Sequence, residues 1–322
     1  MDWEQRNIRF CAGVLACATA LRLISGGALV PVGQALRSSE TASFLVYLQT
    51  GRVVRTLPEP PAQAVPQTAA PVRQALTAFR GSDAALVGLD DNCGRSPDVE
   101  KWLQEPLELE LNGPEPKVLI LHTHTTESFA QTQDRYTETS PYRTLDPGHN
   151  MIALGEILAQ VLQAAGIGVI HDTAFHDYPS YNGAYSHAAA STGAYLEQYP
   201  SIELVLDLHR DAADTATGQL VTRCSIGGES AAQLMFVVGT DTRLNHPGWE
   251  RNLSLALKLQ VLLEQENRGI CRDMNLTKNR YNQHLGPYAL LVEVGAAGNT
   301  LAQAELAARE LGEAIVRLAG AE

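Results

Sequence analysis

The stretch VLILHTHTTES, residues 118–128, indicates both how the chain folds and where its chemistry lies. Its apolar beginning is typical of a short strand that is buried on both faces. Two histidines and a carboxylate follow directly, where a parallel strand would reach the surface at its carboxyl end. Open α/β sheets bind their ligands at that edge. The stretch therefore predicts a buried strand that leads into a functional site.

The polar part of this stretch has the residue types of a zinc site. His124 and Glu127 are three residues apart, so both can face one point in a tight turn. Imidazole and carboxylate groups are two of the three protein ligands that a catalytic zinc needs. In the alternative, Thr125 or Thr126 caps a helix and the histidines are solvated. His122 points the same way as His124 in an extended chain, so it could be a ligand or a transition-state donor instead.

Beyond Pro116, short apolar strands alternate with helical patterns. We expect strands at 118–121, 167–170, 204–206, 234–238 and 289–294, and helices at 150–164, 181–199, 252–264 and 301–318. This order predicts an α/β fold with a mostly parallel central sheet and helices on both faces. Alternating leucines and glutamates at 107–111 predict an additional edge strand.

His209 follows another buried strand, in DLHRDA at 207–212. If that strand is a parallel neighbour of the strand before His122, then His209 can join His124 and Glu127. Two histidines and a glutamate, with one position open to water, form the catalytic zinc pattern of thermolysin and carboxypeptidase A. The sequence therefore predicts the metal ligands His124, Glu127 and His209.

Two residues beside His209 have candidate supporting roles. Asp207 lies on the same side of the strand, where it could fix the tautomer of an imidazole from behind. It could equally be a helix-cap or ion-pair residue. Arg210 could stabilise the oxyanion of a tetrahedral intermediate, or it could simply pair with Asp211.

Glu293 lies in the otherwise apolar stretch ALLVEVG, residues 289–295. Moving a carboxylate out of water is costly unless it gains a partner. Near a zinc site, its expected role is that of a general base, which takes a proton from the attacking water and passes it to the leaving amine. The structural alternative is a buried ion pair with Arg210 or Arg280.

Other polar residues are candidates for substrate binding. Tyr181 and Asn182 follow a strand end and precede a helix, so they could line a substrate groove or cap that helix. Asn282 and Gln283, just before the Glu293 strand, could hold an amide-rich substrate by hydrogen bonds. Four further histidines have no obvious partners and are expected to be solvated: His149, His187, His246 and His284.

Composition excludes some functions. The formal net charge of −12 argues against a nucleic-acid partner, because neutralising phosphates requires a basic face. The five cysteines show no paired short spacing, so they indicate neither a disulfide framework nor a cysteine metal site.

The N-terminal part is expected to lie outside the catalytic domain. Residues 8–30 are long and apolar enough to span a bilayer, although Arg22 interrupts them. We expect residues 1–30 to be a membrane anchor, with a cleaved signal or a buried helix as alternatives. Residues 31–75 are expected to form a spacer with a Pro/Ala-rich linker, residues 76–116 a lead-in segment, and residues 117–322 the catalytic domain.

Four segments together resemble the stage II sporulation protein P family of peptidoglycan hydrolases. They are VLILHTHTTES at 118–128, HDYPSYNGAY at 176–185, DLHRDA at 207–212 and YNQHLGPYALLVEVGAAGNT at 281–300. The resemblance implies a zinc-dependent fold related to N-acetylmuramoyl-L-alanine amidases, with Zn²⁺ held by His124, Glu127 and His209. Glu293 would then be the catalytic carboxylate.

The resemblance also implies a biological setting. It implies cleavage of the amide between muramic acid and the stem peptide of peptidoglycan, with reported endopeptidase activity in the family. It further implies an enzyme anchored in the cell membrane on the wall side, working with a lytic transglycosylase during engulfment. Two other hypotheses compete with the amidase: a carboxypeptidase-like zinc peptidase, and a non-catalytic module that binds the wall or recruits partners.

Overall fold

The computed structural model of the chain describes residues 79–133, 135–215 and 218–320. The expected anchor at 1–30 and the spacer at 31–75 lie outside these residues. Within the described ranges, no helix is long and apolar enough to cross a membrane.

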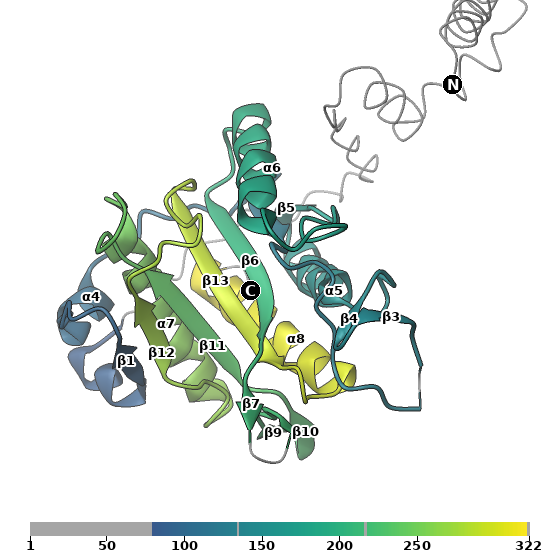
Figure 1. The fold of residues 1–322 in the computed structure, drawn as a ribbon. Coiled ribbons are helices and arrows are strands. Elements are labelled where there is room, and N and C mark those ends of the chain that lie inside the picture. The colour runs from purple at the N-terminus through teal and green to yellow at the C-terminus, as the bar shows by residue number, and fades with distance from the viewer. Residues whose placement is uncertain (1–78, 134, 216–217, 321–322) are drawn as a thin grey trace, which may run out of the picture. The chain divides into compact units, whose positions relative to one another are not determined.

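The described residues form a seven-stranded sheet at the centre of the fold (Figure 1). Its strand order is β1-β12-β11-β13-β6-β2-β5. The strands are β1 (Leu89–Asp91), β2 (Gly113–Leu121), β5 (Ile167–His171), β6 (Leu204–Asp211), β11 (Leu234–Gly239), β12 (Met274–Thr277) and β13 (Tyr288–Ala296). All neighbours are parallel except β11 and β13. This confirms the predicted mostly parallel sheet.

The antiparallel pair divides the sheet into two groups of strands with opposite directions. Strands β5, β2, β6 and β13 are mutually parallel, so their carboxyl ends meet along one edge, here called the carboxyl edge. Strands β11, β12 and β1 run the other way. Three of these four strands, β2, β6 and β13, contain or lead into the residues predicted to bind metal or act in catalysis.

Alternate side chains of these strands face opposite sides of the sheet. Leu204, Leu206 and Leu208 of β6 belong to the main hydrophobic core. The residues between them, including Asp207 and His209, face the other side. The same alternation holds in β13, where the core leucine and valines flank Glu293. Asp207, His209 and Glu293 therefore share the face that lies away from the core.

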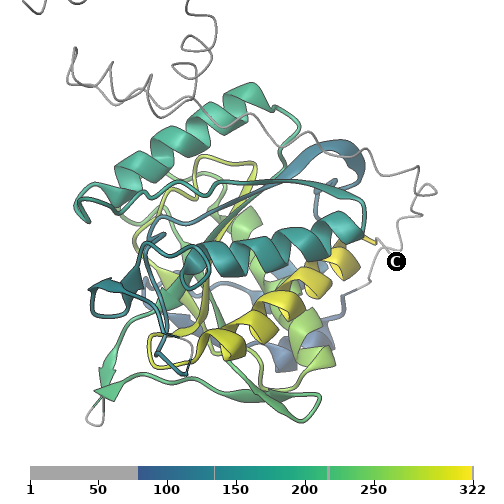
Figure 2. The ribbon, with the colours of Figure 1, turned by 90° about the vertical axis from the view of Figure 1, so that its right-hand side faces the viewer.

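Three helices of the described residues cover the core face of the sheet: α5 (Met151–Ala164), α7 (Trp249–Glu266) and α8 (Leu301–Ala319). A shorter helix, α4 (Val99–Gln104), packs against α7. Figure 2 shows α5, α8 and α7 stacked beside one another, with α6 (Ala184–Gln198) set apart from them. The crossover from β5 through α6 to β6 runs back past β2, so a right-handed connection puts α6 on the opposite face. The structure confirms a mixed α/β fold, with the packed helices on the core face of the sheet.

The segment before β2 is part of the same body. Strand β1 extends the sheet beside β12, and α4 packs against α7. The buried ammonium of Lys258 in α7 joins them by donating to the carbonyl oxygens of Trp102 and Glu105, each at 2.8 Å. A short 3₁₀ helix, η1 (Gly81–Leu86), precedes β1.

The predicted edge strand at 107–111 is wrong. These residues lie outside the strands and helices, and the N–H of Glu108 donates to the hydroxyl of Tyr288 instead of a neighbouring strand. Leu107, Leu109 and Leu111 all pack against the main core. The edge position in the sheet is taken by β1, which is too short for its pattern to be recognised.

In the part of the chain that the structure describes, three short two-stranded hairpins lie outside the main sheet, in the segments that connect its strands and helices. They are formed by β3 (Glu138–Ser140) with β4 (Arg143–Thr144), by β7 (Asp214–Thr215) with β8 (Gly218–Gln219), and by β9 (Cys224–Ile226) with β10 (Glu229–Ala231). Arg143 of the first hairpin forms an isolated antiparallel β-bridge with Glu127, which places this hairpin next to the candidate site.

Gly155 allows α5 to pack closely over two histidines. A Cβ at this position would clash with Nε2 of His171 and lie 2.6 Å from Nε2 of His122. We predict that Gly155→Ala lowers the free energy of unfolding by about 1–3 kcal/mol through overpacking. Alanine otherwise favours a helix interior over glycine by about 1 kcal/mol.

Denaturant unfolding would measure this effect. Gly193→Ala in α6 is the matched control, because a Cβ there meets no atom within 4 Å. That variant should gain stability from helix propensity alone. Equal stabilisation of both variants would show that Gly155 is not a packing requirement.

Candidate active site

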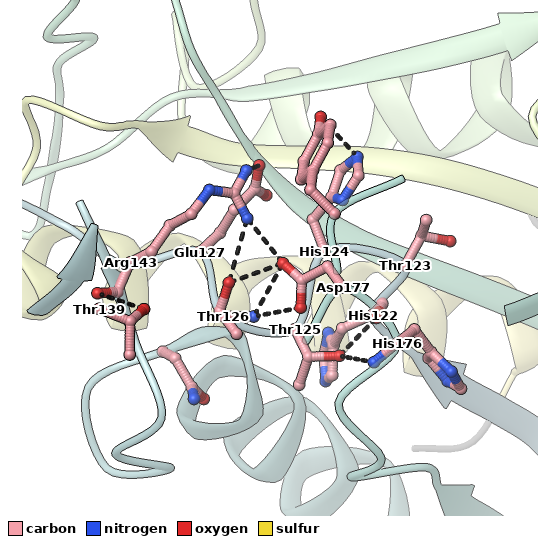
Figure 3. A network of polar contacts seen from close by, with 12 residues as sticks. His122, Thr123, His124, Thr125, Thr126, Glu127, Thr139, Arg143, His176 and Asp177 are labelled. Carbon is pink, nitrogen blue, oxygen red and sulfur yellow. Dashed lines mark hydrogen bonds and ion pairs between the residues drawn. The ribbon is translucent and has the colours of Figure 1, made fainter. Parts of the chain in front are cut away.

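The residues after β2 form a tight turn and not the first turn of a helix. The N–H of Glu127 donates to the carbonyl oxygen of His124 at 3.0 Å, which closes the turn at the predicted three-residue spacing. The hydroxyl of Thr125 donates to the carbonyl oxygen of His122 at 2.7 Å. Both N–H and hydroxyl of Thr126 donate to the carboxylate of Asp177 (Figure 3). The threonines therefore fix the turn and do not cap a helix.

Parallel pairing of β2 with β6 connects this turn to His209. Leu121 is opposite Asp207 in the register of the two strands. The N–H and the hydroxyl of Thr123 donate to the two carboxylate oxygens of Asp207 at 2.8 and 2.6 Å. As a result, the turn and the end of β6 are held together at the carboxyl edge.

The structure brings His124, Glu127 and His209 close together. Nδ1 of His209 is 3.7 Å from Oε2 of Glu127, and the ring centroids of His124 and His209 are 5.2 Å apart. All three side chains are buried. Burial, followed by the neighbouring His209 and Arg143, lowers the pKa of His124 to about 3, which keeps its imidazole neutral.

Asp207 lies behind His209. Its Oδ1 is 3.0 Å from Nε2 of His209, so the two form a buried ion pair when the imidazole is protonated. Burial alone would lower the pKa of His209, but Asp207, Glu127 and Glu293 together raise it to about 9. Asp207 therefore orients the histidine and also anchors the turn through Thr123.

Glu293 is the half-buried neighbour of His209. The two residues are register partners on β13 and β6, and both face the side of the sheet away from the main core. Oε2 of Glu293 is buried and has no hydrogen-bond partner in the described part of the chain. Burial raises the pKa of Glu293 to about 8. The alternative pairing with Arg280 does not form, because the Arg280 guanidinium donates to the carbonyl oxygen of Asn245.

His122 does not lie with His124. It is completely buried and faces α5, where its Nε2 is 2.9 Å from Nε2 of His171 and its Nδ1 is 3.3 Å from the carbonyl oxygen of Leu208. The tight turn sends His124 back to the other face, so the extended-chain assumption does not hold. This placement does not support the predicted catalytic role of His122.

Arg210, predicted as an oxyanion stabiliser, directs its guanidinium at backbone carbonyl oxygens. Its Nε and Nη2 donate to the carbonyl oxygens of Ser128 and Tyr142, both at 3.0 Å, and its side chain is buried. Its N–H donates to Oε2 of Glu127 at 3.2 Å, and its Nη1 is 3.8 Å from Oε1. Arg210 therefore holds Glu127 from the core side. Asp211 pairs with Arg272 and not with Arg210.

Sequence reasoning missed a second arginine beside Glu127. Nη2 of Arg143 is 3.3 Å from Oε1 of Glu127, while its Nη1 donates to Asp177 at 2.6 Å and to Thr126 at 3.1 Å (Figure 3). Its guanidinium also lies over the ring of Tyr181. Arg143 comes from the β3–β4 hairpin, whose sequence carries no pattern that points to the site.

Of the residues predicted to bind substrate, Tyr181 and Asn182 lie on the exposed loop before α6. Tyr181 is 56% exposed, yet its ring stacks on His124 at 4.6 Å and its hydroxyl is 3.2 Å from Nε2 of His124. It therefore lies between the candidate ligand and solvent, where a substrate would contact it.

Asn282 and Gln283 have structural partners. The side-chain amide of Asn282 donates to the carbonyl oxygen of Tyr185 at 2.7 Å. Gln283 is buried, and its amide bonds to the N–H of Gly239 and the carbonyl oxygen of Val237. Its hydrogen-bonding groups are directed into β11, so a substrate role for Gln283 is not supported. His246, expected to be solvated, is also buried.

The side chains at the carboxyl edge fit a zinc ion in kind, but they are not arranged as a finished metal site. Among the residues that the structure describes, no group of three or more His, Cys, Asp or Glu side chains could hold a metal ion as placed. Nε2 of His124 is turned to Tyr181, whereas its Nδ1 is buried without a partner. Two imidazoles and a carboxylate are nevertheless zinc donors.

The fold and the site together define an α/β protein with histidines and carboxylates converging at the carboxyl edge of a mostly parallel sheet. The family model described as Stage II sporulation protein P (SpoIIP) matches residues 73–316. The match covers well over half of the chain, and the chain therefore belongs to the SpoIIP family.

A curated relative and several solved structures are also similar. The Stage II sporulation protein P of Bacillus subtilis (strain 168) is 27% identical over 208 residues, which cover 61% of this chain and 49% of the relative. The chain thus spans about half the length of that relative.

Two solved amidases resemble the chain more distantly. The N-acetylmuramoyl-L-alanine amidase from Clostridium difficile 630 is 18% identical, with a TM-score of 0.37, covering 64% of this chain and 95% of that chain. The amidase AmiC2 of Nostoc punctiforme is 13% identical, with a TM-score of 0.39, covering 64% and 97%. Values this low assign no function to the chain.

Proposed function

We propose that the chain is a peptidoglycan hydrolase that cleaves the N-acetylmuramoyl-L-alanine amide bond during sporulation. The observation that carries this proposal is Oε2 of Glu293, which is buried beside His209 without a hydrogen-bond partner in the described part of the chain, at the edge where His124 and Glu127 also lie. Membership of the SpoIIP family supports the substrate and the setting.

The proposed ligands of a zinc ion are His124, Glu127 and His209. A bound zinc would act as a Lewis acid on the scissile carbonyl and would lower the pKa of the attacking water. Burial keeps His124 neutral, and a neutral imidazole can act as a ligand. Asp207 positions His209 from behind, which is a common arrangement around ligand histidines.

Glu293 is the proposed general base. Its carboxylate takes a proton from the attacking water and returns it to the nitrogen of the leaving L-alanine as the C–N bond breaks. Arg210 and Arg143 hold Glu127 from two sides, so that its carboxylate stays directed toward His209. The products would be muramic acid with a free lactyl carboxylate and a stem peptide with a free amino terminus.

Metal removal tests the chemistry. We expect a strong chelator to reduce amide cleavage by the purified protein to the background rate, and added zinc to restore it. The rate of release of amino groups from purified sacculi is the measurement. Full activity after verified removal of all bound metal would contradict the zinc mechanism.

Product analysis identifies the bond. Mass spectrometry of the soluble products should show free stem peptides that begin at L-alanine. Release of single terminal amino acids would instead indicate a carboxypeptidase-like zinc peptidase. Binding to sacculi without any soluble product would indicate a non-catalytic wall-binding module.

The remaining parts of the proposal concern the cellular setting. We propose that the chain works at the cell membrane on the wall side, attached through residues 1–30, and together with a lytic transglycosylase during engulfment. Fractionation of cells expressing the full chain and a chain lacking residues 1–30 tests the attachment. Equal recovery of both proteins in the soluble fraction would contradict it.

A further inference from the structure

A hydrogen-bond donor near the scissile carbonyl would help to stabilise the developing oxyanion of the proposed reaction, and the guanidinium of Arg210 is already engaged elsewhere. The Arg210 guanidinium donates to two backbone carbonyl oxygens on the core side of β6. Acyl transfer gains much of its rate from donors that point at the carbonyl oxygen as it becomes negative. A donor on the face that carries His209 and Glu293 would add to the stabilisation that a bound zinc would give the same oxygen.

Three tyrosines on that face are candidates, and their hydroxyls differ in availability. The hydroxyl of Tyr181 is 3.2 Å from Nε2 of His124, and that of Tyr281 accepts from Asn279 at 3.4 Å. The hydroxyl of Tyr185 has no hydrogen-bond partner among residues 79–133, 135–215 and 218–320. Of the three tyrosines, Tyr185 is therefore the one whose hydroxyl group is available to donate a hydrogen bond to a substrate.

The ring of Tyr185 is held against the candidate site. Its centroid is 5.5 Å from that of His124, 6.4 Å from that of His209 and 5.6 Å from that of Tyr281. Tyr185 lies in the first turn of α6, and its carbonyl oxygen accepts from Asn282 at 2.7 Å.

The loop that contains Asn282, the donor to the carbonyl oxygen of Tyr185, has an unfavourable backbone conformation. Tyr281 and Asn282 have φ values of 44° and 63°. Such left-handed conformations in residues other than glycine persist where the surrounding structure fixes them, and they gather at functional sites. The hydrogen bond to Tyr185 is thus part of a rigid support for the ring.

We propose that Tyr185 is a further catalytic residue, whose hydroxyl donates a hydrogen bond to the carbonyl oxygen of the scissile amide in the transition state. This inference rests on the proposed function. As the water oxygen bonds to the acyl carbon, Glu293 takes the water proton and the carbonyl oxygen becomes an oxyanion. Tyr185 keeps its proton and stabilises that oxygen until the C–N bond breaks and the proton passes to the leaving amine.

The Tyr185→Phe variant tests the role, because it keeps the ring and removes the hydroxyl. We expect kcat for amide cleavage to fall by about 100-fold, as for the loss of one oxyanion donor, with KM changed by less than about threefold. Zinc affinity and melting temperature should stay close to those of the parent protein. Tyr199→Phe at the other end of α6, whose hydroxyl accepts from Gln198, is the matched control and should keep full activity.

A second readout does not depend on turnover. A phosphinic analogue of the muramoyl-alanine amide, with a tetrahedral phosphorus in place of the acyl carbon, presents a stable oxyanion. Calorimetry should show that Tyr185→Phe binds it about 100-fold more weakly than the parent protein does, matching the loss in kcat/KM.

Two results would overturn the inference while the proposed function survives. One is a Tyr185→Phe variant with at least half of the parental kcat. The other is a loss of activity matched by an equal loss of zinc affinity, which would make Tyr185 a structural support of His124. If the parent protein itself releases no stem peptide, the proposed function fails, and the role of Tyr185 fails with it.

Discussion

Replacing Glu293 by glutamine is expected to reduce kcat for amide cleavage by about 10²- to 10⁴-fold, the usual contribution of a general base. The amide has nearly the same shape as the carboxylate, but it cannot accept the proton of the attacking water. Because Oε2 of Glu293 is buried without a hydrogen-bond partner in the described part of the chain, the neutral amide should leave the free energy of unfolding unchanged or raise it. Stem-peptide release and denaturant unfolding measure the two effects.

Glu264→Gln in α7 is the matched control for a buried glutamate. Its two carboxylate oxygens accept from the N–H groups of Gly269 and Cys271 at 2.9 and 2.8 Å. An amide can accept only one of these bonds, so this variant should lose about 1–3 kcal/mol of stability and keep its kcat. A Glu293→Gln variant that is fully active would remove Glu293 from the mechanism.

The second large effect is a difference between His122 and His124: replacing one should change the stability of the fold, and replacing the other should change zinc affinity. His124→Ala should weaken zinc binding by more than about 100-fold, the upper limit for residues that merely orient a ligand. His122→Ala should instead leave zinc affinity within about tenfold of the parent value and lower the free energy of unfolding by about 2–4 kcal/mol. The cause is a cavity under α5 and the loss of the buried contact with His171.

Competition with a chromogenic chelator and unfolding of the metal-free protein measure these two quantities. Each variant is the control for the other, because both remove a buried imidazole. The opposite pattern, with zinc binding lost in His122→Ala and retained in His124→Ala, would move the candidate site to the core face of the sheet.

Much of the fold could be predicted from the sequence because buried parallel strands are almost entirely apolar. The runs at 118–121 and 204–206 marked β2 and β6, and their parallel pairing followed from the helices between them. The direction of β11 relative to β13 could not be predicted in this way. A buried strand has the same apolar residue pattern whether its neighbour in the sheet is parallel or antiparallel, so the pattern does not reveal the direction of β11.

The predicted site depended on the assumed backbone direction at the end of β2. The spacing of His124 and Glu127 was sufficient to predict a turn that brings them together, and the structure forms that turn. The same reasoning failed for His122, because residues 123–126 form a turn, so the side-chain alternation of an extended strand does not continue from His122 to His124.

Other roles could not be predicted because the side chains concerned form hydrogen bonds with backbone groups. Arg210 and Gln283 are polar residues near the site in sequence, but their side chains satisfy carbonyl and N–H groups that only the folded chain brings near. Arg143 and Tyr185 reach the site from a hairpin and a helix end. No periodicity or spacing marks such residues, since their position depends on tertiary structure.

The most direct measurement is a crystal structure of the zinc-loaded protein, with the ion located by its anomalous scattering. The account predicts one ion at the carboxyl edge, about 2.0–2.2 Å from donor atoms of His124, Glu127 and His209, with Glu293 beside the open coordination position. An ion bound at His122 and His171, or His209 remaining paired with Asp207 and far from any ion, would contradict it.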